Sequence, residues 1–293
     1  MTVTHCLPSG SAAASQIQVP GINIGSVIAQ TGTLKGVLVY LHGMQAGAGA
    51  GFPEELYNTD VLLPNWNLLL CQTIAATGWY VIAPSEPGDG YAVGGQNVAL
   101  YDDIGADSGH GTRLVGTTLE WWDHMVLFIQ RTISASVPIV PVGFSWGGWN
   151  ALQIAIGRTS TIAGYVAHHP ASIVSDLNPA WVLETFSDIT TTGADVTSSA
   201  LNGVTSVPGL LGWGSVDEVV GPSPWTADTL TPAIYSAAHG AGAPVTPNCD
   251  GTGTTSAGSP AENHVLTSST DNANPNNDVY RIAAWFAANL PHN

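Results

Sequence analysis

Ser145 is the residue of this 293-residue chain whose surroundings most directly predict chemistry. It lies at the centre of a Gly-x-Ser-x-Gly motif, between an apolar run at 138–142 that is typical of a strand and a helix-like segment at 147–156. A serine on a sharp strand-to-helix turn exposes its hydroxyl, and that turn needs small residues two positions before and after it, here Gly143 and Gly147. The amino end of the following helix also favours negative charge beside the serine. The pattern predicts a nucleophilic serine, and its structural alternative is a glycine-rich turn at a sheet edge.

A nucleophilic serine requires a histidine that accepts its proton and an acid that holds this histidine in the right tautomer. Asp217 follows an apolar run at 210–214, which places a carboxylate at the carboxyl end of a strand, where sites in parallel sheets gather. An ordinary loop aspartate is the alternative here, and the neighbouring Glu218 is a competing acid. His264 follows Asp217 in a late loop and completes the chain order Ser, Asp, His. The other histidines precede the serine, lie at the termini, or belong to a strand end or a helix: His5, His42, His110, His124, His168, His169, His239 and His292.

The loop after the apolar run 36–41 is expected to supply an oxyanion donor. Gly43 lets the backbone approach closely, so the N–H of Met44 can point at an oxyanion, and the N–H of Trp146 is the second expected donor. We interpret the ring of His42 as a brace for this loop rather than as the base. Several indoles near the predicted loops indicate an apolar or aromatic pocket, although Trp149 and Trp213 could equally belong to the core. The residues expected at the pocket are His42, Gly43, Trp149, His168, Trp181 and Trp213.

The composition excludes several classes of partner. The chain has 5 Lys and Arg residues against 21 Asp and Glu residues, a net charge of -16. So few cations cannot form the basic patch that nucleic acid or an anionic membrane surface requires. No apolar run of about 20 residues is present to span a membrane, and the first residues do not read as a signal peptide. Only 9% of the residues are charged, and the uncharged polar surface this implies favours an extracellular or particle-associated setting.

Neither the cysteines nor any common metal-binding motif of the sequence predicts a cofactor. Cys71 lies in an apolar helical run and is expected to be a small buried residue. Cys6 and Cys249 lie in loop-like sequence, and both a disulfide between them and two free thiols remain open. The sequence contains no CxxC or HExxH motif, so we expect no metal site and no cofactor.

Apolar strand-like runs alternate with helix-length segments, which predicts parallel βαβ units in a single α/β domain over residues 1–293. We expect a mostly parallel central sheet flanked by helices. Two segments depart from the alternation: residues 171–205 are predicted to form a lid or cap insertion, and residues 240–262 a long loop. The strands are expected at 36–41, 79–84, 137–144, 162–167 and 210–214, and the helices at 62–76, 114–133, 147–156 and 278–290.

With these motifs in place, the chain resembles the α/β-hydrolase superfamily over roughly residues 34–290. The resemblance rests on 41–43, 83–90, the turn around Ser145, 214–220 and 263–264, and it is greatest to the small esterase, cutinase-like and dienelactone-hydrolase-like branches. Two features depart from the usual pattern: Ser85 stands where Asp usually follows the strand, and Asp217 lies further from His264 than is common.

The sequence therefore predicts a serine hydrolase that cleaves small-molecule or polymeric carboxylic esters through an acyl-enzyme on Ser145. A peptidase or amidase on the same scaffold is an alternative, because fold and triad do not determine the leaving group. A hydrolase-like domain used as a binding or structural module of an extracellular particle is the alternative from another class. The intact series Ser145, Asp217 and His264 argues against such a loss of activity.

Overall fold

The computed structural model describes residues 3–5, 26–41, 66–84, 115–170, 196–213, 230–249 and 278–290. These residues form an eight-stranded sheet with the order β1-β2-β4-β3-β5-β6-β7-β8. The strands are β1 (Val3–His5), β2 (Ser26–Ile28), β3 (Gly36–Leu41), β4 (Trp79–Ala83), β5 (Ile139–Phe144), β6 (Tyr165–His168), β7 (Gly209–Trp213) and β8 (Val245–Cys249). β2 pairs antiparallel with β1 and β4, and every later pair is parallel. The expected mostly parallel sheet is thus confirmed.

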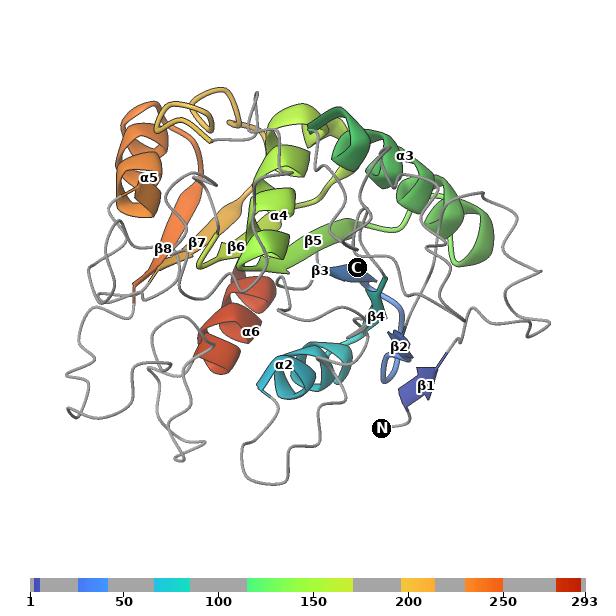
Figure 1. The fold of residues 1–293 in the computed structure, drawn as a ribbon. Coiled ribbons are helices and arrows are strands. Elements are labelled where there is room, and N and C mark those ends of the chain that lie inside the picture. Colours follow the sequence, from blue (N-terminus) through green and yellow to red (C-terminus); the bar gives the residue numbers. More distant parts are fainter. Residues whose placement is uncertain are drawn as a thin grey trace, which may run out of the picture.

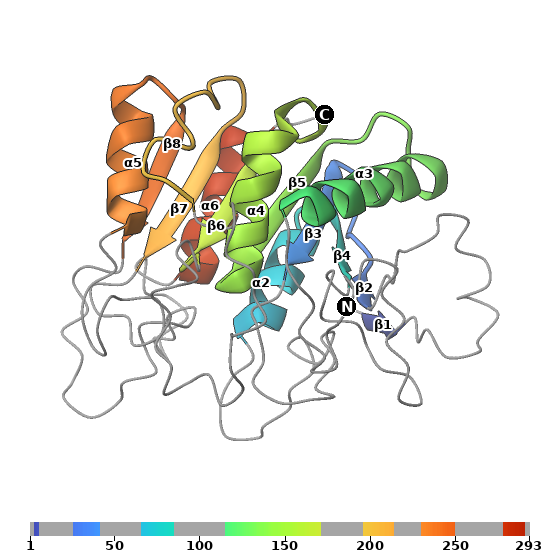
Figure 2. The ribbon, with the colours of Figure 1, turned by 45° about the horizontal axis from the view of Figure 1, so that its top comes forward.

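Helices cover both faces of this sheet (Figures 1 and 2). One face carries α3 (Val115–Thr132), α4 (Trp146–Gly157) and α5 (Leu230–Gly240), and the other carries α2 (Trp66–Ala75) and α6 (Asp278–Asn289), which contact each other. A short 3-10 helix, η2 (Thr159–Thr161), follows α4. None of the helices in the described ranges is long and apolar enough to cross a membrane.

The central strands are apolar almost throughout because the sheet is covered on both sides. In β3 all six residues are buried: Val37 and Val39 point into the core under α3 and α4, whereas Leu38 and Tyr40 point into the core under α2 and α6. The strand expected at 36–41 is therefore confirmed with its bounds. The helix that ends before Gly78 is confirmed as well, since Gly78 has a φ of 108° beyond the last turn of α2.

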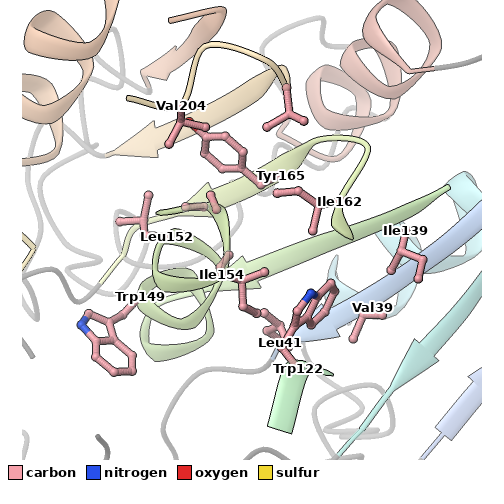
Figure 3. Close-up of a cluster of buried hydrophobic side chains, with 14 of the residues drawn as sticks. Val39, Leu41, Trp122, Ile139, Trp149, Leu152, Ile154, Ile162, Tyr165 and Val204 are labelled. Carbon is pink, nitrogen blue, oxygen red and sulfur yellow. The ribbon is translucent and has the colours of Figure 1, made fainter. Parts of the chain in front are cut away.

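The larger core lies under α3 and α4 and is rich in aromatic side chains (Figure 3). Trp122 and Trp149 are fully buried there, and the indole N–H of Trp122 donates a hydrogen bond to the Thr161 hydroxyl at 2.9 Å. Tyr165 of β6 enters the same core, and burial raises the pKa of its phenol, which therefore stays neutral. On the outer side, Arg158 after α4 binds both carboxylate oxygens of Asp123 on α3, at 2.7 and 2.8 Å.

The prediction of a loop over 240–262 is wrong for its first part, because residues 245–249 form β8. Pro247 and Asn248 disfavour a strand in the interior of a sheet. Within the described sheet, β8 is an edge strand that pairs only with β7, so a proline without an N–H can face outward there. The short antiparallel strands β1 and β2 were also not anticipated.

The segment predicted as a lid, 171–205, falls largely outside the described residues. Its described end packs against the larger core, in which Val196, Leu201 and Val204 are buried. A lid role for the remainder stays a prediction.

Candidate active site

Ser145 occupies the single position between β5 and α4 and has a strained backbone. Its φ is 54° and its ψ is -114°, a conformation that residues with a side chain rarely adopt. Backbone strain of this kind costs on the order of 1–3 kcal/mol and persists where the surrounding structure imposes it. The turn predicted from the Gly-x-Ser-x-Gly motif is therefore present at the expected residue.

The glycines around Ser145 make this turn sterically possible. A Cβ on Gly143 would overlap the carbonyl group of Gly147, and a Cβ on Gly148 would lie 2.9 Å from the Cα of Pro170. Both neighbours are backbone atoms that cannot move aside. Close backbone approach thus requires glycine two positions before Ser145, at Gly143, and three positions after it, at Gly148.

Main-chain hydrogen bonds connect the turn to both neighbouring elements. The N–H of Ser145 donates to the carbonyl oxygen of His168 at the end of β6 (2.9 Å), and the carbonyl oxygen of Ser145 accepts from the N–H of Trp149 in α4 (3.1 Å). The Ser145 side chain, 8% exposed, does not cap α4. The hydroxyl therefore stands at the amino end of a helix, where the helix dipole stabilises developing negative charge.

A second strained residue, His169, lies beside the first. His169 has a φ of 45° directly after β6, and its N–H donates to the carbonyl oxygen of Gly212 at 2.8 Å. Its ring packs against those of His168 and Phe144, with centroid distances of 4.5 and 6.0 Å. In the described part of the chain, Ser145 and His169 are the only residues other than glycine with a positive φ. Such strain clusters at functional sites.

The other members of the predicted triad lie outside the described residues. Asp217 follows the last residue of β7, Trp213, and His264 lies between β8 and α6. Because β5, β7 and β8 are parallel, the segments that follow them start from the same edge of the sheet. The topology is therefore compatible with the predicted triad, whose two remaining members stay predictions.

The expected oxyanion donors and pocket residues are placed only in part. His42, Gly43, Met44 and Trp181 lie outside the described residues, while Trp146 begins α4 directly after Ser145. Leu41, the residue before His42, pairs with Gly143, so the loop after β3 starts next to the turn. A pocket role for any of these residues remains a prediction.

Three of the expected pocket residues do have described side chains. Trp149 is fully buried in the core under α4, as the alternative interpretation allowed. Trp213 is half-buried and packs against Tyr235 of α5, with ring centroids 5.7 Å apart. His168 is 1% exposed and points toward α6, where it meets Asn248 and Asp278. Arg281 contacts Asn248 in turn, and sequence reasoning identified none of these three polar residues. Within the described ranges, no group of His, Cys, Asp and Glu is arranged to hold a metal ion.

No protein-family model matches the chain, and no curated protein sequence does either. Solved structures superpose on most of it. Esterase Pf2001 of Pyrococcus furiosus has a TM-score of 0.54 at 13% identity, over 88% of this chain and 85% of the esterase. The acylaminoacyl peptidase of Pyrococcus horikoshii has a TM-score of 0.54 at 11% identity, over 90% of this chain and 39% of the peptidase. Dipeptidyl peptidase 4 of Porphyromonas gingivalis has a TM-score of 0.57 at 16% identity, over 90% of this chain and 33% of that protein.

This chain thus spans only 39% and 33% of the two peptidases, but most of the esterase. At these identities the likeness establishes the fold. The chain has the α/β-hydrolase fold, as the motifs predicted, and its structural neighbours include hydrolases of ester and peptide type.

Proposed function

We propose that this protein is a serine hydrolase that cleaves carboxylic esters through an acyl-enzyme on Ser145. One observation carries the proposal: Ser145 holds a strained backbone conformation on a one-residue turn between β5 and α4. If the turn were only structural, a glycine at this position would remove the strain, because glycine adopts a positive φ without steric cost. The chain instead has a serine there, with glycines packed around it, and this supports a nucleophilic role.

The proposed mechanism assigns one task to each predicted residue. The Ser145 oxygen attacks the acyl carbon while His264 accepts the hydroxyl proton, and His264 then gives this proton to the departing alcohol. Water, activated by the same histidine, hydrolyses the acyl-enzyme and restores Ser145. Asp217 orients His264, and the N–H groups of Met44 and Trp146 stabilise the oxyanion.

Cleavage of peptide bonds is the second candidate, supported by the peptidases among the structural neighbours. A p-nitrophenyl ester and a p-nitroanilide with the same acyl group would discriminate the two, because they differ only in the leaving group. We expect the ester to be turned over and the anilide to be resistant. Comparable kcat/KM values for both substrates would favour the peptidase.

A fluorophosphonate probe tests the serine mechanism directly, because it phosphonylates serines that an adjacent base activates. We expect one label per chain, located on Ser145 by peptide mass spectrometry and absent in Ser145→Ala. Ser136→Ala is a matched control, since Ser136 is exposed before the amino end of β5, far along the strand from Ser145. A protein that takes up no label and hydrolyses neither substrate would instead be a binding or structural module.

A further inference from the structure

A buried polar cluster lies at the carboxyl end of the sheet, on the α6 side. It consists of His168 on β6, Asn248 on β8, and Asp278 and Arg281 on α6. The amide nitrogen of Asn248 donates to Oδ1 of Asp278 at 2.8 Å, and Arg281 donates to the amide oxygen of Asn248 at 3.1 Å. Nε2 of His168 lies 3.3 Å from the same Oδ1 of Asp278 and 3.2 Å from the Asn248 amide nitrogen.

A glycine allows these residues to meet across a strand. His168 pairs with Gly212 of β7, and Gly212 pairs with Asn248, so all three lie in one row of the sheet. A Cβ on Gly212 would overlap the His168 ring and lie 2.8 Å from its Nε2. The imidazole therefore passes over Gly212 to reach the edge strand and α6.

The carboxyl group of Asp278 is buried and hydrogen-bonded. Its side chain is 0% exposed, and it lies in the first turn of α6, where the helix dipole stabilises an anion. Because a carboxylate only accepts hydrogen bonds, we assign the ring proton of His168 to Nε2, which then donates to Asp278. The Asn248 amide nitrogen 3.2 Å away is itself a donor, so with this tautomer it is a neighbour of Nε2 and not its hydrogen-bond partner. Nδ1 of His168 has no hydrogen-bond partner among the described residues, and a buried acceptor without a partner is more common than a buried donor without one.

The cluster connects two parts of the proposed active site. Asn248 and Asp278 flank residues 250–277, the segment that contains His264, and the hydrogen bond between them holds the two ends of that segment together. At the same time, the carbonyl oxygen of His168 accepts the N–H of Ser145. One residue thus contacts both the backbone of the proposed nucleophile and the ends of the segment that carries the proposed base.

We propose that His168, Asn248 and Asp278 are positioning residues for the hydrolytic reaction, which fix the ends of segment 250–277 relative to Ser145. This inference rests on the proposed function. Proton transfer between Ser145 and its base requires a hydrogen-bond geometry that a displacement of roughly 1 Å degrades by about 10²-fold. A cluster that served only to attach α6 would affect stability without this loss in turnover.

The test compares kcat and KM for a short p-nitrophenyl ester among His168→Leu, His168→Gln, Asn248→Ala and the wild type. We expect His168→Leu and Asn248→Ala to lower kcat by about 10²-fold with little change in KM, and the rate of fluorophosphonate labelling to fall with kcat. His168→Gln should recover most of the activity, since its amide nitrogen can donate to Asp278 from near the position of Nε2. Asn248→Ala lies on an edge strand and serves if His168→Leu does not fold.

Ile282→Val is the matched control, because Ile282 is a fully buried apolar residue on the same helix, outside the cluster. It should lower Tm and leave kcat within about twofold of the wild type. The inference is overturned if the cluster variants lower Tm as Ile282→Val does and retain wild-type kcat. A wild-type protein that neither hydrolyses the ester nor accepts the label would instead refute the proposed function, and the positioning role with it.

Discussion

Two strand-to-helix connections of this protein are held in place in different ways. β5 passes into α4 through Ser145 alone, whereas residues 250–277 separate β8 from α6. The first connection depends on close backbone packing, since there is no room for a Cβ on Gly143 or Gly148. The second is held by polar side chains that meet at its two ends, Asn248 and Asp278. The one-residue turn is thus set by backbone atoms in direct contact, whereas the ends of the long connection are joined by side chains from distant positions.

The first connection carries the largest expected effect. Ser145→Ala should lower turnover of short p-nitrophenyl esters by about 10⁶-fold, since it removes the nucleophile itself. Tm should change little, because alanine places a Cβ where serine already has one. Steady-state kinetics and a thermal melt check both points. More than a trace of remaining activity would place the nucleophile elsewhere and leave the strained turn without a chemical role.

The next largest effect on turnover is expected at Asp217, the predicted acid after β7. Asp217→Asn should preserve the fold and lower turnover by about 10³–10⁴-fold, because the amide favours the wrong tautomer of His264. Glu218→Gln is the control from the adjacent position and should be nearly silent. If Glu218→Gln were the damaging change instead, the predicted alignment of the residues after β7 would be wrong.

The pH dependence of turnover tests whether His264, in segment 250–277, acts as the base. Turnover should rise with pH through a midpoint near 6.5–7, since an unperturbed imidazole has a pKa of about 6.5 and only its neutral form accepts the serine proton. Below the midpoint the rate should fall about tenfold per pH unit. His264→Ala should abolish the activity, whereas His239→Ala, on the exposed surface of α5, should not. A flat profile from pH 5 to 9 would contradict a histidine base.

Three glycine-to-alanine variants compare the two connections through the free energy of unfolding. Gly143→Ala should cost more than about 3 kcal/mol, because its Cβ meets backbone that cannot move. Gly212→Ala meets the His168 ring, which can rotate, and should cost about 1–3 kcal/mol. Gly203→Ala, where nothing lies within 4 Å, should be neutral or slightly stabilising. Urea denaturation gives this order, and equal losses for Gly143→Ala and Gly212→Ala would contradict the distinction between the two connections.

A small effect is also expected for an ion pair on the outer side of α3 and α4. Arg158 and Asp123 form an ion pair whose side chains are 32% and 45% exposed. Solvent screens such a pair, so Arg158→Gln should change the free energy of unfolding by at most about 1 kcal/mol and leave turnover unaffected. A larger loss of turnover would mean that the orientation of α4 depends on its carboxyl end as well as on the turn at Ser145.

Part of this fold follows from patterns within short stretches of sequence. The run at 36–41 predicts β3 with its bounds because a strand buried on both faces must be apolar throughout. The turn at Ser145 is predictable for a similar reason, since Gly143 and Gly147, whose close approach it requires, are only four positions apart. The approach of Gly148 to Pro170, in contrast, is visible only in the structure. The strand β8 is not predictable in this way, because Pro247 and Asn248 are acceptable only at a sheet edge, and the sequence does not state which strand will be at the edge.

The sequence by itself determined the nucleophile candidate and the alternation of strands and helices, because each rests on local periodicity or on a short motif. The α/β-hydrolase fold entered as a resemblance carried by these motifs, and the structure confirmed it. Only the tertiary structure decided that His168 turns toward α6, and that Asn248 and Asp278 meet it there. These side chains come from positions 80 and 30 residues apart. The register of three parallel strands brings His168 and Asn248 into one row, and Asp278 reaches them from α6. Their contact depends on Gly212 having no side chain between them, a condition that exists only once the strands have paired.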